Sequence, residues 1–171
     1  MSMSRIAMLA MIALSLVCGG CQTVTTVILV RHAERAPGSQ DPPLSAAGQQ
    51  RAETLAKVVS GAGVETIYAT QFQRTQQTAA PTATATGVMP VIISVNGPVS
   101  QHASEVASRV MADNKNRTAL VCSHSNIVHL IAQELGAPGV APLSESEYDR
   151  LIIIVKRGNQ TRIIQGRYGQ P

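Results

Sequence analysis

The stretch VILVRHAERAPGSQDPPLSAAGQQRAETLA, residues 27–56, decides the fold. It opens with an apolar, largely β-branched run and then sets Arg31, His32, Glu34 and Arg35 close together. The apolar run predicts a buried strand. A protein core rejects unpaired charge, whereas the end of a strand in a parallel α/β sheet is where ligands bind. We therefore expect this charged group to lie at one edge of a sheet.

The residues that follow the charged group favour a helix. Ser45 is placed to cap it, and Arg51, Leu55 and Val59 recur at helical spacing. The stretch as a whole thus predicts a strand, a loop and a helix in that order.

Strands and helices alternate through the rest of the chain. Strands are predicted at 65–70, 88–95 and 117–124, and helices at 71–87, 104–114 and 125–136. We expect Pro81 to kink or end the helix at 71–87, because proline lacks the amide hydrogen that the helix needs. The tail at 150–169 alternates around Gly158 and Asn159, which predicts a hairpin.

This order of elements predicts the α/β class. The expected architecture is a three-layer α/β/α sandwich with a mostly parallel central sheet and an antiparallel C-terminal edge hairpin. The first and the fourth predicted strands both end in histidine, at His32 and His124.

The first twenty residues differ from the rest of the chain. One positive charge, the apolar run IAMLAMIALSLV and two glycines predict a signal peptide. The run is too short for a membrane-spanning helix, which takes about 20 apolar residues. The sequence around Cys21 resembles a bacterial lipobox, although Cys18 stands where leucine is usual, and the resemblance implies lipidation at Cys21. The predicted divisions are a signal peptide at 1–20, a tether at 21–25 and one domain at 26–171.

The same resemblance implies a location. Gln22 after the modified cysteine implies an outer-membrane lipoprotein of the bacterial cell envelope that faces the periplasm and touches the membrane only through its lipid. Without the lipid, the protein would be secreted or periplasmic. Cys122 would then be the cysteine left over, and its apolar neighbours predict a buried strand residue rather than a reactive thiol.

Composition excludes several classes of function. The chain has 171 residues, of which 44% are hydrophobic and 14% charged, which suits one domain with an aliphatic core. Its formal net charge of +4 is interrupted by acidic residues, so we expect no nucleic-acid partner. His124 and His129 do not have the spacing of a zinc pair on one helix face. No nucleotide, haem or iron motif is present, so we expect no cofactor and no metal.

Four segments in order resemble the histidine phosphatase superfamily, the phosphoglycerate-mutase-like enzymes. They are LVRHAE at 29–34, LSAAGQQRAETLA at 44–56, YATQFQRTQQTA at 68–79 and ALVCSHSN at 119–126. The family pattern is a strand ending in Arg-His-Gly, then Leu-Thr-x-x-Gly-x-x-Gln or a variant, then Ser-x-x-x-Arg-x-x-x-Thr-Ala, and a strand ending in a second histidine. The short chain is most similar to the small phosphohistidine-phosphatase-like branch.

The resemblance implies a role for each matching residue. His32 would be the nucleophile and would become a phosphohistidine, while its other ring nitrogen donates to a backbone carbonyl. Arg31 and Arg74 would clamp the phosphoryl oxygens through bidentate hydrogen bonds, and His124 would donate to the same oxygens. Such donors stabilise the charge of the transition state.

The general acid is the part of the pattern that this sequence lacks. Ser125 follows His124 where many family members have Asp, and no acid follows the third strand before Glu105. Glu34 is either the general acid or a structural carboxylate. In the structural role it would pair with one of three arginines, Arg31, Arg35 or Arg74. The weaker candidates for the acid are Asp41 and His102.

Two functions from different classes follow. One is an exported phosphatase that hydrolyses phosphomonoesters or phosphoramidates of a small molecule or a phosphoprotein through His32. The alternative is a catalytically weak or inactive phosphate-binding envelope lipoprotein of the same fold. We expect the loops at 35–43, 94–104 and 137–149 to form the pocket rim, but nothing in them specifies the substrate or the oligomeric state.

Overall fold

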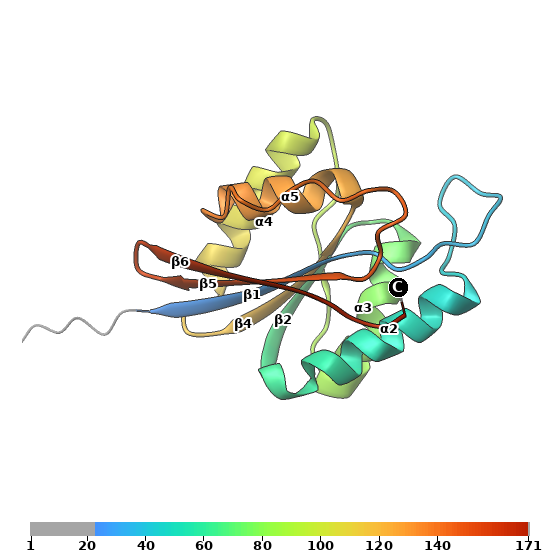
Figure 1. Ribbon diagram of the computed structural model, residues 1–171, viewed down its shortest axis with the longest axis horizontal. Helices are drawn as coiled ribbons and strands as arrows, with labels where there is room; N and C mark the ends of the chain where they lie inside the picture. Colours follow the sequence, from blue (N-terminus) through green and yellow to red (C-terminus); the bar gives the residue numbers. More distant parts are fainter. Residues whose placement is uncertain (1–22, 171) are drawn as a thin grey trace, which may run out of the picture.

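The computed structural model describes residues 23–170 of the chain. Within these residues, six strands form one mixed sheet in the order β3-β2-β4-β1-β5-β6 (Figure 1). Their bounds are β1 Val24–Arg31, β2 Val64–Ala69, β3 Val91–Ile92, β4 Thr118–Ser123, β5 Arg150–Arg157 and β6 Gln160–Arg167. Strands β3, β2, β4 and β1 are parallel, whereas β5 and β6 are antiparallel to their neighbours. The predicted parallel sheet with an antiparallel edge hairpin is therefore confirmed.

Helices cover both faces of this sheet. They are α2 Ala46–Val59, α3 Gln73–Thr86, α4 Val99–Asp113 and α5 Ser125–Glu134, and a 3₁₀ turn at Ser60–Ala62 follows α2. Figure 1 shows α2 and α3 packed together on one side of the sheet and α4 and α5 on the other. The predicted three-layer sandwich is confirmed.

Strand β1 is the central strand that the apolar run predicted. Val27 and Leu29 pack into the core under α4 and α5, while Ile28 and Val30 pack into the core under α2 and α3. Both faces are buried, which explains why the run is continuously apolar. The strand begins at Val24 rather than after the predicted tether at 21–25, because β1 pairs with β5 along that whole length. The predicted signal peptide and the predicted lipidation of Cys21 lie outside the described residues.

Helix α2 begins where the sequence predicted. The Ser45 hydroxyl accepts a hydrogen bond from the Gly48 amide at 3.1 Å. Gly48 lies directly against the backbone of Glu34, and a Cβ at this position would stand 2.1 Å from the Glu34 carbonyl oxygen. Glycine is therefore required here, because it lets the helix approach the residues that follow β1.

Of the two effects predicted for Pro81, a kink or the end of the helix, the end of the helix is wrong. Helix α3 continues through Pro81 to Thr86 and ends at Gly87 in the left-handed conformation. The residues Thr78, Ala79 and Thr82 on either side of the proline are buried against the rest of the molecule. This packing holds the helix together across the lost backbone hydrogen bond, so tertiary structure overrides the local preference.

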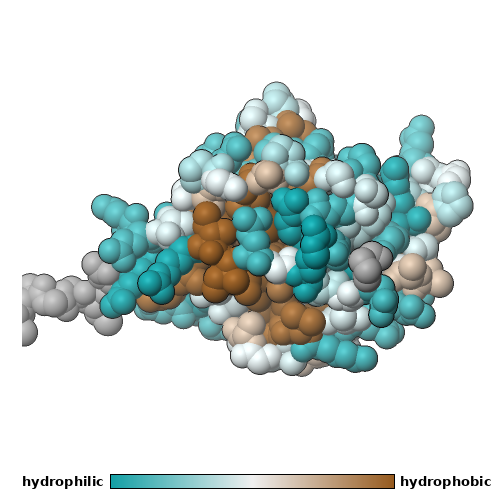
Figure 2. All heavy atoms as spheres, viewed as in Figure 1, coloured by the Kyte–Doolittle hydropathy of each residue, from teal (hydrophilic) through white to brown (hydrophobic). Residues whose placement is uncertain are grey.

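The outer strands are shorter or more exposed than the sequence predicted. The strand predicted at 88–95 shrinks to the two residues of β3. At the opposite edge, β6 exposes Ile163 at 38% and Ile164 at 59%, and Figure 2 shows hydrophobic atoms gathered over the hairpin. Within residues 23–170, no helix has both the length and the hydrophobicity to cross a bilayer.

Candidate active site

A cavity of about 360 Å³ opens at the carboxyl ends of β1 and β4. Parallel pairing sets Arg31 opposite Ser123, so the next residues, His32 and His124, emerge side by side. Their ring centroids are 5.4 Å apart, and both side chains are buried. The other residues that line the cavity are Arg31, Arg35, Phe72, Arg74, Val95, Val99, Ser125, Asn126, Ile127 and Glu145. The three loops predicted to form the rim each contribute to this lining.

His32 is held in one tautomer. Its Nδ1 lies 2.8 Å from the Ala33 carbonyl oxygen, which can only accept, so Nδ1 carries the hydrogen. Burial, followed by the nearby guanidinium groups of Arg31, Arg74 and Arg35, lowers the pKa of His32 to about 4. The ring is therefore neutral at physiological pH, and Nε2 keeps a free lone pair. The predicted contact of the second ring nitrogen with a backbone carbonyl is present.

His124 is held by its other nitrogen. Its Nε2 lies 3.0 Å from the Thr70 hydroxyl, and that hydroxyl is 2.9 Å from the Thr75 hydroxyl. Its Nδ1 lies 3.5 Å from Arg74 Nη2, which can only donate. Burial, followed by the charges of His32 and Arg74, lowers the pKa of His124 to about 3. The ring is neutral and turns Nδ1, not an N–H, toward Arg74.

Arg74 projects into the cavity from the first turn of α3. Its guanidinium lies 4.3 Å from the Phe72 ring, and its buried Nε has no protein partner. Asp41, one of the weaker candidates for the general acid, lies 3.5 Å from Arg74 Nη1 and accepts from the Gln73 amide at 3.1 Å. Asp41 therefore caps α3 from a neighbouring loop and does not line the cavity.

Arg31 has a role that the sequence did not reveal. Its Nη1 donates to the carbonyl oxygens of Ser144, Glu145 and Glu147, at 2.9, 2.8 and 3.2 Å. Its guanidinium also stacks on the Tyr148 ring at 4.1 Å. Much of the donor capacity predicted for phosphate holds the loop before β5 instead, while the buried Nε has no protein partner.

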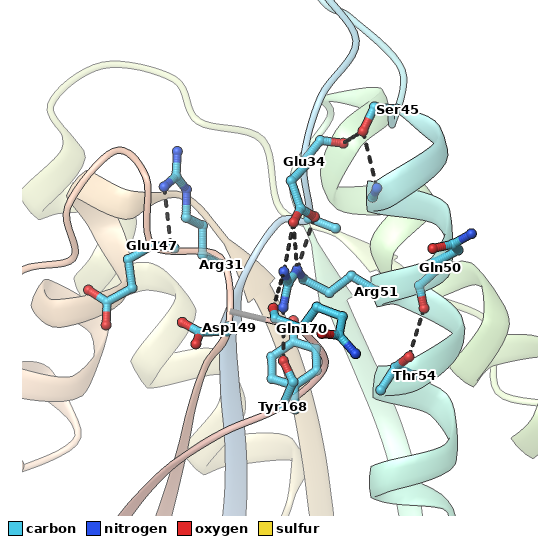
Figure 3. Close-up of polar contacts among 12 residues, drawn as sticks. Arg31, Glu34, Ser45, Gln50, Arg51, Thr54, Glu147, Asp149, Tyr168 and Gln170 are labelled. Atoms are coloured by element: carbon cyan, nitrogen blue, oxygen red, sulfur yellow. Dashed lines mark hydrogen bonds and ion pairs between the residues drawn. The ribbon is translucent and has the colours of Figure 1, made fainter.

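The structure corrects the predicted partners of Glu34. Its carboxylate pairs with Arg51 of α2 through contacts of 2.7, 2.9 and 3.0 Å, not with Arg31, Arg35 or Arg74 (Figure 3). Figure 3 shows Arg31 and Glu34 pointing to different sides of the end of β1. Burial by itself raises the pKa of the Glu34 carboxyl, but the hydrogen bonds and the charge of Arg51 help to outweigh it, so this pKa lies below its ordinary value. Glu34 does not line the cavity, so its geometry favours the structural role over that of the acid.

The remaining predicted candidates also lie away from the cavity lining. His102 is buried at 2% exposure on the inner face of α4, and Glu105 is exposed on the outer face. Cys122 is a buried strand residue, as predicted, and burial raises the pKa of its thiol to about 12. Among residues 23–170, no three His, Cys, Asp or Glu side chains gather in a way that could hold a metal ion.

Three polar residues that line the cavity, Ser125, Asn126 and Glu145, were not among the predicted site residues. The Ser125 hydroxyl donates to Glu145 Oε1 at 2.6 Å, and Arg31 Nη2 donates to Glu145 Oε2 at 3.1 Å. Glu145 was inside a loop that the sequence analysis placed at the pocket rim, but no spacing in that loop marks one acid above another.

The matching family model and the similar solved structures both concern phosphatases. The family model of the histidine phosphatase superfamily (branch 1) matches residues 27–95, while no curated protein matches the chain. The protein histidine phosphatase SixA complexed with tungstate has a TM-score of 0.65 and 17% identity, covering 83% of this chain and 96% of that one. The SixA of Nakamurella multipartitia has a TM-score of 0.58 and 23% identity, covering 86% and 96%. A phosphoserine phosphatase from Entamoeba histolytica has a TM-score of 0.63 and 15% identity, covering 86% and 98%.

These structural likenesses establish a shared fold. The family match spans His32 and Arg74, and the fold brings the second histidine, His124, beside them. The resemblance stated from the four sequence segments is thus confirmed. Residues 27–95 are thus similar to the histidine phosphatase superfamily (branch 1), and the described part of the chain has the fold of the solved SixA phosphatases.

Proposed function

We propose that this protein is a phosphatase and that it works through a covalent phosphohistidine on His32. The observation that carries the proposal is the state of His32: a buried, neutral ring whose Nδ1 is fixed by the Ala33 carbonyl and whose Nε2 is free. A neutral imidazole with a fixed tautomer is the form that can attack phosphorus.

In the first step, His32 Nε2 attacks the phosphorus atom and the bond to the leaving group breaks. Arg74 and Arg35, together with the unpartnered Nε of Arg31, offer donors at the cavity for the phosphoryl oxygens. Positively charged donors held in place stabilise the charge on these oxygens, and the loss of one such donor typically costs about 100-fold to 1,000-fold in rate.

In the second step, water attacks the phosphohistidine. The phosphorus–nitrogen bond breaks, phosphate leaves and His32 recovers its neutral form. Splitting one difficult hydrolysis into two displacements is the usual advantage of covalent catalysis.

The substrate class follows from the cavity. Its walls combine the cationic side chains with three apolar ones, Phe72, Val95 and Val99. Its volume of about 360 Å³ suits a small phosphorylated molecule or one phosphorylated side chain of a protein. Solved relatives that are phosphatases of phosphohistidine and of phosphoserine support this range.

We also propose that the phosphatase is exported and anchored by a lipid on Cys21. The support is the order of charge, apolar run and small residues before that cysteine. In a bacterial host, the wild-type protein should fractionate with the outer membrane and incorporate labelled fatty acid, whereas Cys21→Ser should do neither. Equal labelling of both proteins would contradict the anchor.

The proposal for His32 is tested with the purified full-length protein in mild detergent. Hydrolysis of an aryl phosphate should be abolished in His32→Ala, and a rapid quench in alkaline denaturant should trap a base-stable, acid-labile phosphoryl group on His32 of the wild type. His129→Gln is the matched control, since His129 does not line the cavity. A folded wild type that binds phosphate without turnover would instead support the inactive phosphate-binding lipoprotein.

A further inference from the structure

One carboxylate reaches the cavity from an unexpected place. Of the described residues that line the cavity, Glu145 alone carries a carboxylate. Its two oxygens accept hydrogen bonds from Ser125 Oγ at 2.6 Å and from Arg31 Nη2 at 3.1 Å. Ser125 directly follows His124, and Glu145 and His124 line the same cavity.

The loop that carries Glu145 is held at several points. Arg31 binds three of its backbone carbonyls. Glu147 pairs with Arg150 through contacts of 2.8 Å, and Asp149 pairs with Arg167 at 2.6 Å. The position of Glu145 is thus determined by its backbone, even though its side chain is 79% exposed.

Glu145 differs in two ways from the other carboxylates near the cavity. Glu34 is bound by Arg51 through three short contacts, and Asp41 caps α3. Glu145 has one hydroxyl and one edge of a guanidinium as partners, and its exposure lets it exchange protons with water. These are the properties of a group that gives up and regains a proton in each cycle.

We infer that Glu145 is the general acid of this phosphatase, positioned by Ser125 and Arg31. The inference rests on the proposed function of His32. As His32 Nε2 bonds to phosphorus and the leaving oxygen departs, the protonated Glu145 carboxyl gives its proton to that oxygen. The resulting carboxylate then takes a proton from the water that attacks the phosphohistidine, which restores the acid.

The charge of the substrate supplies the proton that this step needs. Without substrate, the hydrogen bond from Ser125, and to a lesser extent the charge of Arg31, keeps the pKa of Glu145 below its ordinary value. A phosphoryl dianion in the cavity repels the carboxylate and favours its protonated form. Substrate therefore binds together with a proton on Glu145.

The test compares substrates whose leaving groups differ in basicity. Full-length wild type and Glu145→Gln are assayed on dinitrophenyl, nitrophenyl and phenyl phosphate. The amide oxygen can still accept from Arg31 and the amide NH2 can donate to the Ser125 hydroxyl, but the group has no acidic proton to give. We expect kcat/KM of the variant to fall by about 100-fold or more on phenyl phosphate and by less than about tenfold on dinitrophenyl phosphate, because a good leaving group needs little protonation.

Two further variants separate acid catalysis from loop structure. Glu147→Gln perturbs the same loop without removing a carboxylate from the cavity, so any loss should be equal for all three substrates. Ser125→Ala should reproduce the leaving-group dependence in weaker form, because it frees Glu145 from one partner.

The outcomes distinguish this inference from the proposed function. An equal loss for every substrate in Glu145→Gln, or no loss, overturns the role of Glu145 while a trapped phosphohistidine still supports the His32 route. A wild type that turns over without phosphorylating His32 overturns the proposed function, and with it the step assigned to Glu145.

Discussion

At the scale of single residues, the two buried histidines present opposite nitrogens to one cavity. His32 is bound at Nδ1 and free at Nε2, whereas His124 is bound at Nε2 by Thr70 and turns Nδ1 toward Arg74. Both are neutral because burial lowers their pKa values. The first is therefore suited to attack phosphorus, and the second can donate to phosphate only after it gains a proton.

This difference predicts a change in His124 when an anion binds. A dianion beside Nδ1 favours the imidazolium form, so tungstate should raise the pKa of His124 from about 3 by roughly 2 units or more. The measurement is an NMR titration of the imidazole nitrogens with and without tungstate. The ring signals of His129, outside the cavity, should not respond to tungstate. A ring of His124 that stays neutral at about pH 5 with tungstate bound would contradict its role as a phosphate donor.

At the scale of elements, Arg51 joins three separate parts of the fold. From α2 it binds Glu34, just after β1, and donates to the carbonyl oxygens of Tyr168 at 2.8 Å and Gln170 at 2.6 Å (Figure 3). Gly48 permits this arrangement by bringing α2 against the backbone of Glu34. The loop that begins at His32 is thereby tied both to a helix and to the C-terminal tail.

The pairing of Arg51 with Glu34 makes a prediction for stability. Arg51→Ala should lower the free energy of unfolding by about 3 kcal/mol, because it leaves a half-buried carboxylate and two carbonyls without their partner. The double variant with Glu34→Gln should lose less than the sum of the two single variants, since no unpaired charge remains. Urea denaturation of the four proteins measures this coupling. Strictly additive losses would show that the pair contributes no coupling energy.

Local patterns could predict the elements but not these cross-links. The β-branched run of β1, the Ser45 cap and the histidines that end β1 and β4 are visible in the sequence because each depends on near neighbours. The partners of Glu34 and Arg31 are not, since they lie 17 and 113 or more positions away along the chain. Arg51 stands where the family pattern has glutamine, so the pattern itself did not point to an ion pair.

The loop before β5 shows the same limit on prediction at the site. Its residues have no periodicity, and several acids in it are equivalent by sequence. In the folded protein, Arg31 binds backbone carbonyls of the loop. This contact places Glu145 at the cavity, while Glu147 pairs with Arg150. The four residues that match the family pattern, Arg31, His32, Arg74 and His124, could be predicted from the sequence, whereas Glu145, the inferred general acid, could not.

At the scale of the whole molecule, the buried histidines make the folded protein less stable at acidic pH. His32, His124 and His102 are all buried, and burial is the first cause of the lowered pKa of each. In the unfolded chain these rings regain their ordinary pKa of 6.5. Between that value and their folded values, the unfolded state binds protons that the folded state does not.

We therefore predict that the protein begins to lose stability, as the pH falls, at pH values well above those at which carboxylates titrate. The contribution of the neutral histidines is fully present above about pH 7 and is lost as the pH falls through 6.5 toward the folded pKa values, about 4 for His32 and about 3 for His124. Each should cost roughly 3 kcal/mol by about pH 4. Urea midpoints measured across this range test the slope, which the double variant of His32→Gln and His124→Gln should flatten. An equally steep slope in that variant would place the acid sensitivity elsewhere in the molecule.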